Sequence, residues 1–527
     1  MEHVKYNGPP GTGKTQKLIE ICNIEMRDGR QPNEIIFCSF TRAAAHEARN
    51  RAVQRFGGVP SQYPWFSTEH AICFRMLGLK REQVFTRRHL KEFGKRYNYN
   101  FSGDESEGNY GERYMESMLN TLADHLEFFI SYMENKMLSL DGAYREVTHS
   151  TVTPDGFTKS SIEHYIERRT RYKQDNRIWS FGDMILGALQ QGLSPEGAKV
   201  LILDEAQDSS KLLWELVKLW AGNVESYYVA GDPLQTLYFW SGSSPELFFD
   251  FPGEEEVLRQ THRFGPEIKD YAEKVVTPTG LPFPKFEPSP KHGVVNRVAF
   301  SSIDWHSVPQ SFLLARTRWL ISQLVDDFVK MGIPFISERG RQSPLATTKG
   351  QAFLTLLRLT DGEKVSDTEL RNLIKFTRMP YLERGAKTRI KKLVEGMYGK
   401  TELRQMGFTS NFMDALYDNY TDILSQGFEG WEKSYLRRVY REGGRQAIED
   451  EPRVRITTYH ASKGREASHV FLCPDYTRTV WESFAREALP ERLLMYVGCT
   501  RAKDALTILL PNLSDHFFPY PKVEGAI

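Results

Sequence analysis

Residues 8–15 read Gly8-Pro9-Pro10-Gly11-Thr12-Gly13-Lys14-Thr15, which fits the pattern G-x-x-x-x-G-K-[ST]. In such a loop the backbone N–H groups and the lysine hold nucleotide phosphates, and the Ser/Thr hydroxyl ligates Mg²⁺. A strand-like segment at residues 3–6 precedes the loop, and a helix is expected from residue 16, with its N-terminal dipole toward the phosphates. An ordinary strand-to-helix connection is the competing interpretation, which the Lys-Thr pair disfavours. The stretch predicts a nucleoside-triphosphate site with Lys14 at the β/γ-phosphates and Thr15 on Mg²⁺.

Length and composition limit the class of protein. A chain of 527 residues is too long for one hydrophobic core, so three or four units of ordinary domain size are expected. With 40% hydrophobic and 26% charged residues it has the composition of a soluble globular protein, and its net charge of +1 gives no overall bias toward nucleic acid or membrane. No apolar run approaches the ~20 residues that span a bilayer, and the loop at residues 8–15 stands where a signal peptide would have its apolar core. We expect a cytoplasmic location, in a bacterium or for a phage protein in its host.

Five cysteines are present and none forms a C-x-x-C pair. Three of them stand in apolar, strand-like runs. Buried reduced thiols are therefore predicted, in preference to a disulfide framework, a metal site or an iron–sulfur cluster.

Alternating strands and helices follow the first helix. An apolar run at 34–40 leads into a helix start at 41–49, and a shorter run at 65–67 leads into an apolar helix. This order predicts a parallel sheet with helices on both faces, whose carboxyl-end residues line the ligand-facing edge. Taken singly, such residues more often pack or cap. The residues at this edge are Phe40, Thr41, Thr68 and His70.

The sheet resumes after a charged helical block at about 81–177. An apolar strand at 199–203 ends in Asp204-Glu205, where Asp204 is expected to hold Mg²⁺ and Glu205 to polarise the attacking water. The next strand, at 226–230, runs toward Gln235, and a glutamine at this place can sense the γ-phosphate and orient water. The aromatic cluster just beyond it suits base stacking, although alone it more often belongs to a core.

These motifs stand in one order, and the chain resembles the UvrD/Rep family of superfamily 1A DNA helicases along nearly its whole length. The resemblance rests on the residues 8–15 loop, Phe40-Thr41-Arg42-Ala43-Ala44-Ala45, Thr68-x-His70, Phe181-Gly182-Asp183-Met184, Asp204-Glu205-Ala206-Gln207-Asp208, Gly231-Asp232-x-x-Gln235-x-x-Tyr238-x-Trp240, Leu258-x-x-x-His262-Arg263, Thr458-x-His460-x-x-Lys463-Gly464-x-Glu466 and Glu491-Arg492…Tyr496-Val497-Gly498-Cys499-Thr500-Arg501-Ala502.

The resemblance implies an α/β fold with two RecA-like (P-loop) parallel-sheet motor domains, each carrying a mainly helical insertion. It places the first motor domain at 1–80 and 178–258 with an insertion at 81–177. The second motor domain is placed at 259–340 and 452–527 with an insertion at 341–451. ATP and Mg²⁺ would bind between the two motor domains.

Catalytic roles also follow from the resemblance. Arg263 and Arg501 would be arginine fingers that reach the γ-phosphate from the second motor domain, so that hydrolysis requires a closed cleft. His262 and Glu466 match nucleotide-contacting positions. The complete catalytic set implied is Lys14, Asp204, Glu205, Gln235, Arg263 and Arg501.

Contacts to single-stranded DNA are the other implication. Stacking of bases on aromatic rings tolerates any sequence, and Trp240 is the foremost candidate for a stacking platform. Core packing stays open as the alternative for Phe181 and Tyr238. The positions that match DNA-contacting residues of the family are Phe40, Thr41, Thr68, His70, Phe181, Tyr238, Trp240, Thr458 and His460.

The chain departs from the family pattern at several places. We expect no room before Gly8 for the glutamine-containing segment that reads adenine, and His262 stands where a base-stacking tyrosine is usual. Both departures predict a relaxed preference for ATP. Ser241, Arg465 and Ala467 also replace residues typical of the family.

The leading interpretation is therefore an ATP-dependent 3′-to-5′ DNA helicase that acts on single strands and junctions in DNA repair or replication. The alternative is a translocase or motor subunit that displaces proteins and unwinds poorly alone, which the small second insertion favours. A helicase–nuclease fusion is disfavoured by the short segment after Arg501. A nucleotide-gated DNA-binding scaffold without hydrolysis is disfavoured by the intact catalytic set.

Overall fold

The computed structural model describes residues 2–39, 42–102, 120–150, 153–338, 340–418, 420–424 and 427–523. Phe40 and Thr41, two predicted DNA contacts, lie outside the described residues. The chain forms two compact units, Met1–Gly293 with Glu482–Thr500 and Val294–Trp481 with Arg501–Ile527. No helix in the described parts of the chain combines the length and the apolar character needed to cross a bilayer.

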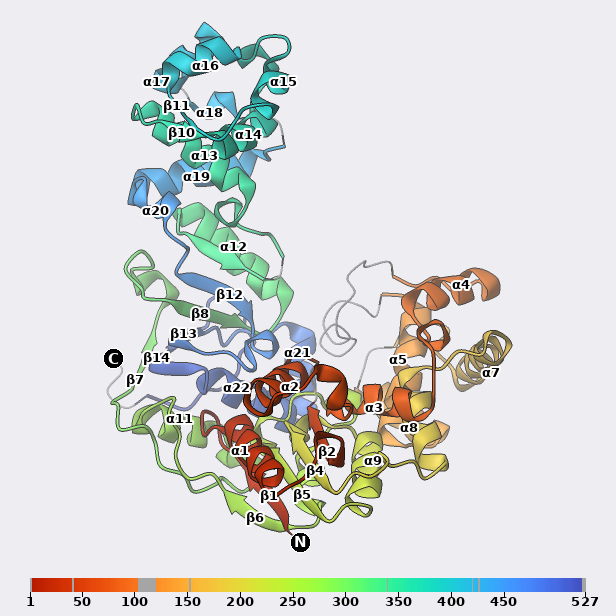
Figure 1. The fold of residues 1–527 in the computed structure, drawn as a ribbon. Helices are drawn as coiled ribbons and strands as arrows, with labels where there is room; N and C mark the ends of the chain where they lie inside the picture. Colours follow the sequence, from red (N-terminus) through yellow and green to blue (C-terminus); the bar gives the residue numbers. More distant parts are fainter. Residues whose placement is uncertain are drawn as a thin grey trace. The chain divides into compact units, whose positions relative to one another are not determined.

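The first unit is built on a six-stranded sheet in the order β3-β2-β4-β5-β1-β6 (Figure 1). Every neighbouring pair in it is parallel. The strands are β1 (His3–Asn7), β2 (Ile35–Ser39), β3 (Phe66–Ser67), β4 (Val200–Asp204), β5 (Ser226–Gly231) and β6 (Glu254–Val257).

Helices cover both faces of this sheet. Successive side chains of each strand point to opposite faces, so an apolar strand needs cover on both sides. In β4, Val200 and Ile202 pack into one apolar cluster, whereas Leu201 and Leu203 pack into another. The first cluster receives α1 (Lys14–Arg27) and α2 (Arg42–Phe56), and the second receives α3 (Glu69–Met76), α8 (Phe181–Gln190) and α9 (Lys211–Ala221). The predicted parallel sheet with helices on both faces is confirmed.

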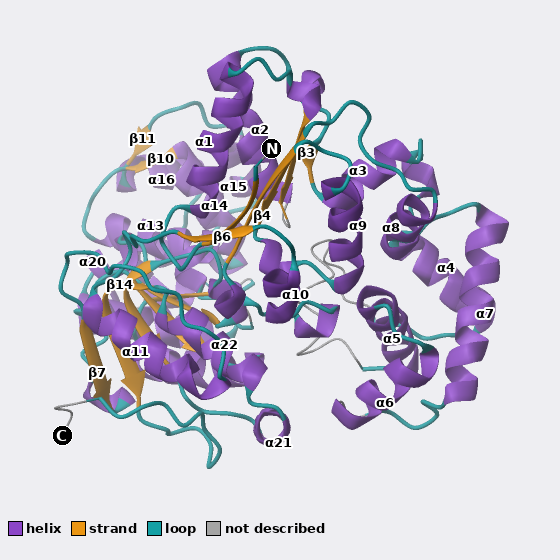
Figure 2. Ribbon diagram, turned by 90° about the horizontal axis from the view of Figure 1, so that it is seen from below, coloured by secondary structure: helices purple, strands orange, loops and turns teal. Residues whose placement is uncertain are grey.

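The first insertion has a core of its own, made by helices. These are α4 (Arg87–Tyr97), α5 (Leu122–Lys136), α6 (Leu140–Ser150) and α7 (Lys159–Asn176), seen as helices in Figure 2. Phe93, Phe129 and Tyr165 are fully buried in this core. Beside them Arg169 binds both carboxylate oxygens of Glu127 at 2.7–3.1 Å. A buried charge is tolerated only when it is paired, so this ion pair ties α5 to α7.

The second unit contains another six-stranded parallel sheet, in the order β7-β14-β13-β8-β12-β9. Helix α12 (Arg318–Met331) packs on it. Two parallel six-stranded sheets with helices confirm the predicted α/β fold class, with two RecA-like sheets. The strands are β7 (Val294–Val298), β8 (Ser311–Ala315), β9 (Phe335–Ser337), β12 (Val454–Thr458), β13 (Ala467–Leu472) and β14 (Ala502–Leu509).

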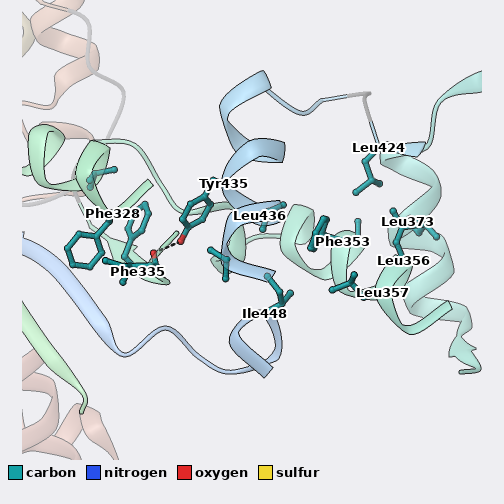
Figure 3. Close-up of a cluster of buried hydrophobic side chains, with 14 of the residues drawn as sticks. Phe328, Phe335, Phe353, Leu356, Leu357, Leu373, Leu424, Tyr435, Leu436 and Ile448 are labelled. Carbon is teal, nitrogen blue, oxygen red and sulfur yellow. Dashed lines mark hydrogen bonds between the residues drawn. The ribbon is translucent and has the colours of Figure 1, made fainter. Parts of the chain in front are cut away.

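The second insertion shares one apolar core with this sheet. Figure 3 shows Phe328, Phe335, Tyr435 and Leu436 in this core. The Phe335 ring lies 5.5 Å from the Tyr435 ring, and the Tyr435 hydroxyl donates to the Ile333 carbonyl at 2.9 Å. The same cluster continues to the far helices of the insertion. The insertion contains α13 (Thr348–Thr360), β10 (Val365–Ser366), α14 (Asp367–Phe376), α15 (Ala386–Lys391), β11 (Met397–Tyr398), α16 (Lys400–Met406), α17 (Ser410–Asp418), α18 (Tyr420–Ile423), α19 (Gly430–Gly443) and α20 (Gln446–Glu449).

The remaining α-helices among the described residues are α10 (Pro245–Asp250), α11 (Pro266–Val276), α21 (Arg478–Arg486) and α22 (Leu489–Cys499). Residues 259–293 and 482–500, which the family resemblance assigns to the second motor domain, lie in the first compact unit. Compactness alone does not define a motor domain, so the motor-domain boundaries remain a prediction. All five cysteines are buried free thiols.

Candidate nucleotide-binding site

The glycine-rich loop lies between β1 and α1, where its backbone can take the left-handed turns that the loop requires. Gly11 and Gly13 have φ of 78° and 79°, in the region that favours glycine. A Cβ on Gly11 would lie 2.6 Å from the Arg263 Cβ and 2.7 Å from the Thr261 Oγ1. Glycine at position 11 therefore allows the segment after β6 to approach the loop closely.

The side chains predicted to hold phosphate and metal meet at the carboxyl ends of β1 and β4. Thr15 Oγ1 donates a hydrogen bond to Asp204 Oδ2 at 2.6 Å. Lys14 Nζ donates to the Gly8 carbonyl oxygen at 2.8 Å, so the lysine folds over its own loop. The structure thus brings together Lys14, Thr15 and Asp204, as a phosphate- and metal-binding site requires.

A chain of hydrogen bonds continues from Asp204 to Gln235. The Glu205 N–H donates to Asp204 Oδ1 at 3.0 Å, and Gln207 Nε2 donates to Glu205 Oε2 at 2.6 Å. Gln207 Oε1 accepts from the Asp232 N–H at 3.0 Å, and Asp232 Oδ2 accepts from Gln235 Nε2 at 2.6 Å. The predicted residues Asp204, Glu205 and Gln235 therefore belong to one polar network.

Gln207 and Asp232 are the links in this network that sequence reasoning did not assign. Both are fully buried. Each lies inside a quoted motif, Asp204-Glu205-Ala206-Gln207-Asp208 or Gly231-Asp232-x-x-Gln235. The polar residue Gln207, two positions after Glu205, is the feature of the sequence that could have predicted this link.

Burial opposes ionisation of the carboxyl groups on the acidic side of the site. Burial first, and then the Glu205 carboxylate, raise the pKa of Asp204 to about 6. Burial likewise raises the pKa of Asp232. A cation beside Asp204 would stabilise its ionised form.

The donor set fits magnesium held jointly with nucleotide phosphates. Thr15 and Asp204 offer adjacent hydroxyl and carboxylate oxygens, and Mg²⁺ usually takes one or two carboxylates together with phosphates and water. In the described ranges, no group of three or more His, Cys, Asp or Glu side chains is arranged to hold a metal ion by itself. The adjacent Thr15 and Asp204 oxygens suit a metal ion that is shared with nucleotide phosphates.

The segment after β6 borders the same loop. β6 pairs in parallel with β1, placing Val257 opposite Asn7. Beyond it, Thr261 Oγ1 donates to the Pro10 carbonyl at 2.6 Å, and the His262 N–H donates to the Gly11 carbonyl at 3.0 Å. The strand pairing carries His262 and Arg263 to the loop, and Thr261, which sequence reasoning missed, anchors them.

The arginine candidates lie in different units. In the first unit, Arg263 Nη1 donates to the Thr500 carbonyl at 3.1 Å. In the second unit, Arg501 is 1% exposed and its Nη1 donates to the Arg465 carbonyl at 3.3 Å. Glu466, the other predicted nucleotide contact of that unit, pairs with Lys503 at 2.6 Å.

The DNA-contact candidates of the first unit differ in exposure. Phe181 is 38% exposed and its ring lies 5.4 Å from that of His70, edge to face. Tyr238 is buried, and Trp240, 6.1 Å from it, packs against the core of the first insertion. Thr68 is nearly buried before α3. Among these described side chains, Phe181 has the largest exposed fraction.

In the second unit, Thr458 and His460 lie together at the carboxyl end of β12. Thr458 Oγ1 accepts a hydrogen bond from the Ala461 N–H at 3.1 Å. Burial, with the positive charges of Arg316 and Lys463, holds the pKa of His460 well below its usual range. At neutral pH this histidine is uncharged and can contact DNA only as a neutral hydrogen-bonding group.

Two family models and several known proteins match this chain. Residues 6–255 match the family model described as UvrD/REP helicase N-terminal domain, and residues 432–512 match UvrD-like helicase C-terminal domain. The chain is 25% identical to a "Probable DNA helicase" of Mycoplasma pneumoniae, over 63% of each chain. It is 21% identical to YjcD of Bacillus subtilis, over 98% of this chain and 78% of that one.

A third relative is the ATP-dependent DNA helicase PcrA of Staphylococcus epidermidis. It is 25% identical over 50% of this chain and 37% of its own length. The chain thus spans less than two thirds of the Mycoplasma and Staphylococcus relatives and more than three quarters of YjcD.

Proposed function

This chain belongs to the UvrD/Rep family of DNA helicases, and from that premise we propose that it uses ATP hydrolysis to move 3′ to 5′ along single-stranded DNA and to unwind duplex. The observation that carries the proposal is the Thr15–Asp204 hydrogen bond beside a complete phosphate-binding loop. A network of side-chain and backbone hydrogen bonds joins that pair to Gln235. The names of the relatives agree with a DNA-dependent motor.

In the proposed reaction, Lys14 exchanges the Gly8 carbonyl for the β/γ-phosphates. Thr15 and Asp204 would hold Mg²⁺, which supplies charge neutralisation on the phosphate oxygens when bound. Glu205 orients the attacking water and accepts its proton, while Gln207 fixes the Glu205 carboxylate from the other side. Gln235 would contact the γ-phosphate, and its hydrogen bond to Asp232 links that contact to the rest of the network.

Arg263 and Arg501 are proposed to neutralise the charge that develops on the transferred phosphoryl group. An arginine finger contributes ~10³–10⁵ in rate in nucleotide hydrolases. Because Arg501 belongs to the second unit, its arrival at the phosphates would make hydrolysis depend on closure of the two units. The motor-domain division given by the family resemblance is part of this proposal.

The proposed DNA path combines aromatic stacking in the first unit with neutral polar contacts in the second. Phe181, with His70 at its edge, offers a stacking surface. Thr458 and His460 would contact the DNA backbone from the end of β12. Alternate release of the two units during ATP turnover would give directional stepping. Single strands and strand–duplex junctions are the proposed substrates; a cytoplasmic location stays a prediction.

The decisive experiment measures ATP hydrolysis with and without single-stranded DNA, followed by strand displacement on duplexes with 3′ or 5′ tails. We expect DNA-stimulated hydrolysis and displacement only from the 3′ tail. No hydrolysis with DNA present would refute the motor, and displacement only from the 5′ tail would refute the direction.

A translocase with weak unwinding is the second candidate. The observation that favours it is the small second insertion, whose core is continuous with the second sheet. DNA-stimulated hydrolysis and displacement of streptavidin from the 5′ end of a biotinylated strand, without strand separation, would select this function over the helicase.

A further inference from the structure

The segment that precedes β13 holds Arg501 in place. Arg501 Nη1 donates to the Arg465 carbonyl at 3.3 Å, and the Arg501 carbonyl accepts from the Ala467 N–H at 3.1 Å. Arg501 is 1% exposed, so its guanidinium has little freedom to compensate if one of these contacts shifts. The position of the Arg465 backbone therefore bears directly on where the Arg501 side chain points.

Packing does little to hold this backbone at Gly464. Gly464 has a φ of 77°, and no atom lies within 4 Å of where a Cβ would stand. The neighbouring Arg465 N–H closes a short turn onto the Ser462 carbonyl at 3.0 Å. A glycine in this conformation costs much backbone entropy to order, so another contact must fix the turn.

The Arg465 side chain supplies that contact. Its Nη1 lies 2.8 and 2.7 Å from the two oxygens of Glu338, and its guanidinium lies 4.9 Å from the centre of the Phe312 ring. Charge-assisted bonds to a carboxylate and cation–π contact both restrict a guanidinium. The guanidinium is therefore held at its tip by Glu338, which directly follows β9, and along its plane by Phe312 of β8.

Glu338 is itself fixed by β12. Arg455 Nη1 donates to Glu338 Oε1 at 2.9 Å, and Thr457 Oγ1 donates to Oε2 at 2.9 Å. Burial opposes ionisation of Glu338, but hydrogen bonds from Arg465, Thr457 and Arg455 hold its pKa below the usual range. The carboxylate is thus charged at neutral pH and anchored to the sheet.

We propose that Glu338 is a positioning residue for Arg501 and acts through Arg465. The inference rests on the proposed function, in which Arg501 completes the phosphate site. It also gives a role to Arg465, which departs from the family pattern. Loss of the anchor would loosen the turn at Gly464 and shift the Arg465 carbonyl, and with it the Arg501 guanidinium.

The test compares two arginines that bind the same carboxylate. Arg465→Leu removes the link to Arg501, whereas Arg455→Leu removes the matched partner on β12, for which the structure shows no bond to Arg501. We expect Arg465→Leu to lower kcat of the DNA-stimulated ATPase about 10- to 100-fold with unchanged KM, because misplacement by about 1 Å costs that much. Arg455→Leu leaves the Thr457 and Arg465 bonds to Glu338 in place and should stay within about twofold of wild type. Glu338→Gln should reproduce the Arg465→Leu effect.

An Arg501→Ala background separates positioning from general damage. If Arg465 acts through Arg501, Arg465→Leu should lower kcat no further in that background, because the two residues act as one unit. An equal additional loss in the Arg501→Ala protein, or wild-type kcat in both Arg465→Leu and Glu338→Gln, would overturn the inference.

Thermal unfolding and binding of a fluorescent ATP analogue show whether each variant is folded. Should Arg465→Leu not fold, Glu338→Gln carries the same comparison. A wild-type protein that hydrolyses no ATP in the presence of DNA would instead refute the proposed function. The two failures are thus distinguishable.

Discussion

The Thr261 hydroxyl donates a hydrogen bond to the Pro10 carbonyl at 2.6 Å, and Thr261 is fully buried. This bond fastens the segment after β6 to the glycine-rich loop. Arg263 follows two residues later, with its Cβ 2.6 Å from where a Cβ on Gly11 would lie. The placement of Arg263 thus depends on a residue that touches the loop backbone and need not touch nucleotide.

Thr261→Val tests this relationship. It removes the hydroxyl at nearly constant volume and leaves the Pro10 carbonyl without its partner, at a cost of about 1–3 kcal/mol. We expect a lower free energy of unfolding in urea and a lower kcat for ATP. Thr261→Ser, which keeps the hydroxyl, is the matched control. Equal effects of both substitutions would show that the methyl group matters and the hydrogen bond does not.

Arg501→Ala is expected to retain nucleotide binding and to lose turnover by ~10³ or more, because only the charge on the transition state is left uncompensated. Steady-state ATPase assays and equilibrium binding of a fluorescent ATP analogue measure the two properties separately. Unchanged steady-state hydrolysis would remove Arg501 from the catalytic set.

Alanine substitutions at Phe181 and Trp240 are expected to differ in their effects on DNA binding and on stability. Phe181→Ala should weaken binding of single-stranded DNA by ~1–3 kcal/mol with little loss of stability, because the ring is 38% exposed. Trp240→Ala should strongly reduce unwinding and DNA-stimulated ATPase activity. It should also lower the melting temperature, because Trp240 packs on the core of the first insertion. Fluorescence anisotropy with labelled oligonucleotides and thermal unfolding check both. Full unwinding by Trp240→Ala would end its assignment to the DNA path.

Glu69 predicts a pH-dependent stability. It is 1% exposed, its Oε1 has no hydrogen-bond partner, and burial raises its pKa to about 7. The folded state therefore binds a proton that the unfolded state releases near pH 4.5, so the stability from this group is lost as pH rises from about 4.5 through 7.

Glu69→Gln mimics the protonated acid and removes this loss. At pH 8.5 the variant should exceed wild type by about 3 kcal/mol, and the difference should shrink toward pH 4.5. Urea unfolding at both pH values provides the measurement. A difference that does not change with pH would show that Glu69 is not the titrating group.

The protein is expected to have a relaxed preference for ATP over other nucleoside triphosphates. His262 is exposed beside the loop and stands where the family usually has a base-stacking tyrosine. We expect GTP and CTP to be hydrolysed with kcat/KM within about tenfold of ATP, since one missing stacking contact is worth ~1–3 kcal/mol by analogy with base–aromatic pairs. His262→Tyr should increase discrimination. A strong ATP preference in the wild-type protein would refute the hypothesis.

Apolar strands were predictable from sequence, and polar edge strands were not. The fully buried strands β2, β4 and β5 are continuous apolar runs, and the predicted segments agree with them to within one residue at each end. β6 reads Glu254-Glu255-Glu256-Val257 and is largely exposed, because an edge strand with one free side needs no apolar face. β6 pairs with β1 through backbone hydrogen bonds, and these cannot be predicted from residue composition.

The candidate site likewise contains residues that the sequence predicts and contacts that it does not. Lys14, Thr15 and Asp204 were predictable because a fixed spacing brings them to one edge of a parallel sheet. The Thr261–Pro10 contact and the Glu338–Arg465 pair join residues 251 and 127 positions apart. Such contacts depend on how whole elements pack, and no local spacing encodes them.

The common core of the second sheet and its insertion limits what can be cut from this protein. The fully buried Phe335 ring packs against Tyr435 of the insertion, with 5.5 Å between the ring centres. A shortened chain that joins residue 340 directly to residue 452 would leave the Phe335 ring without this cover, and it should aggregate on expression instead of yielding a minimal motor. In this chain the insertion is a folding partner of the sheet that carries Arg501, and it is not a detachable accessory.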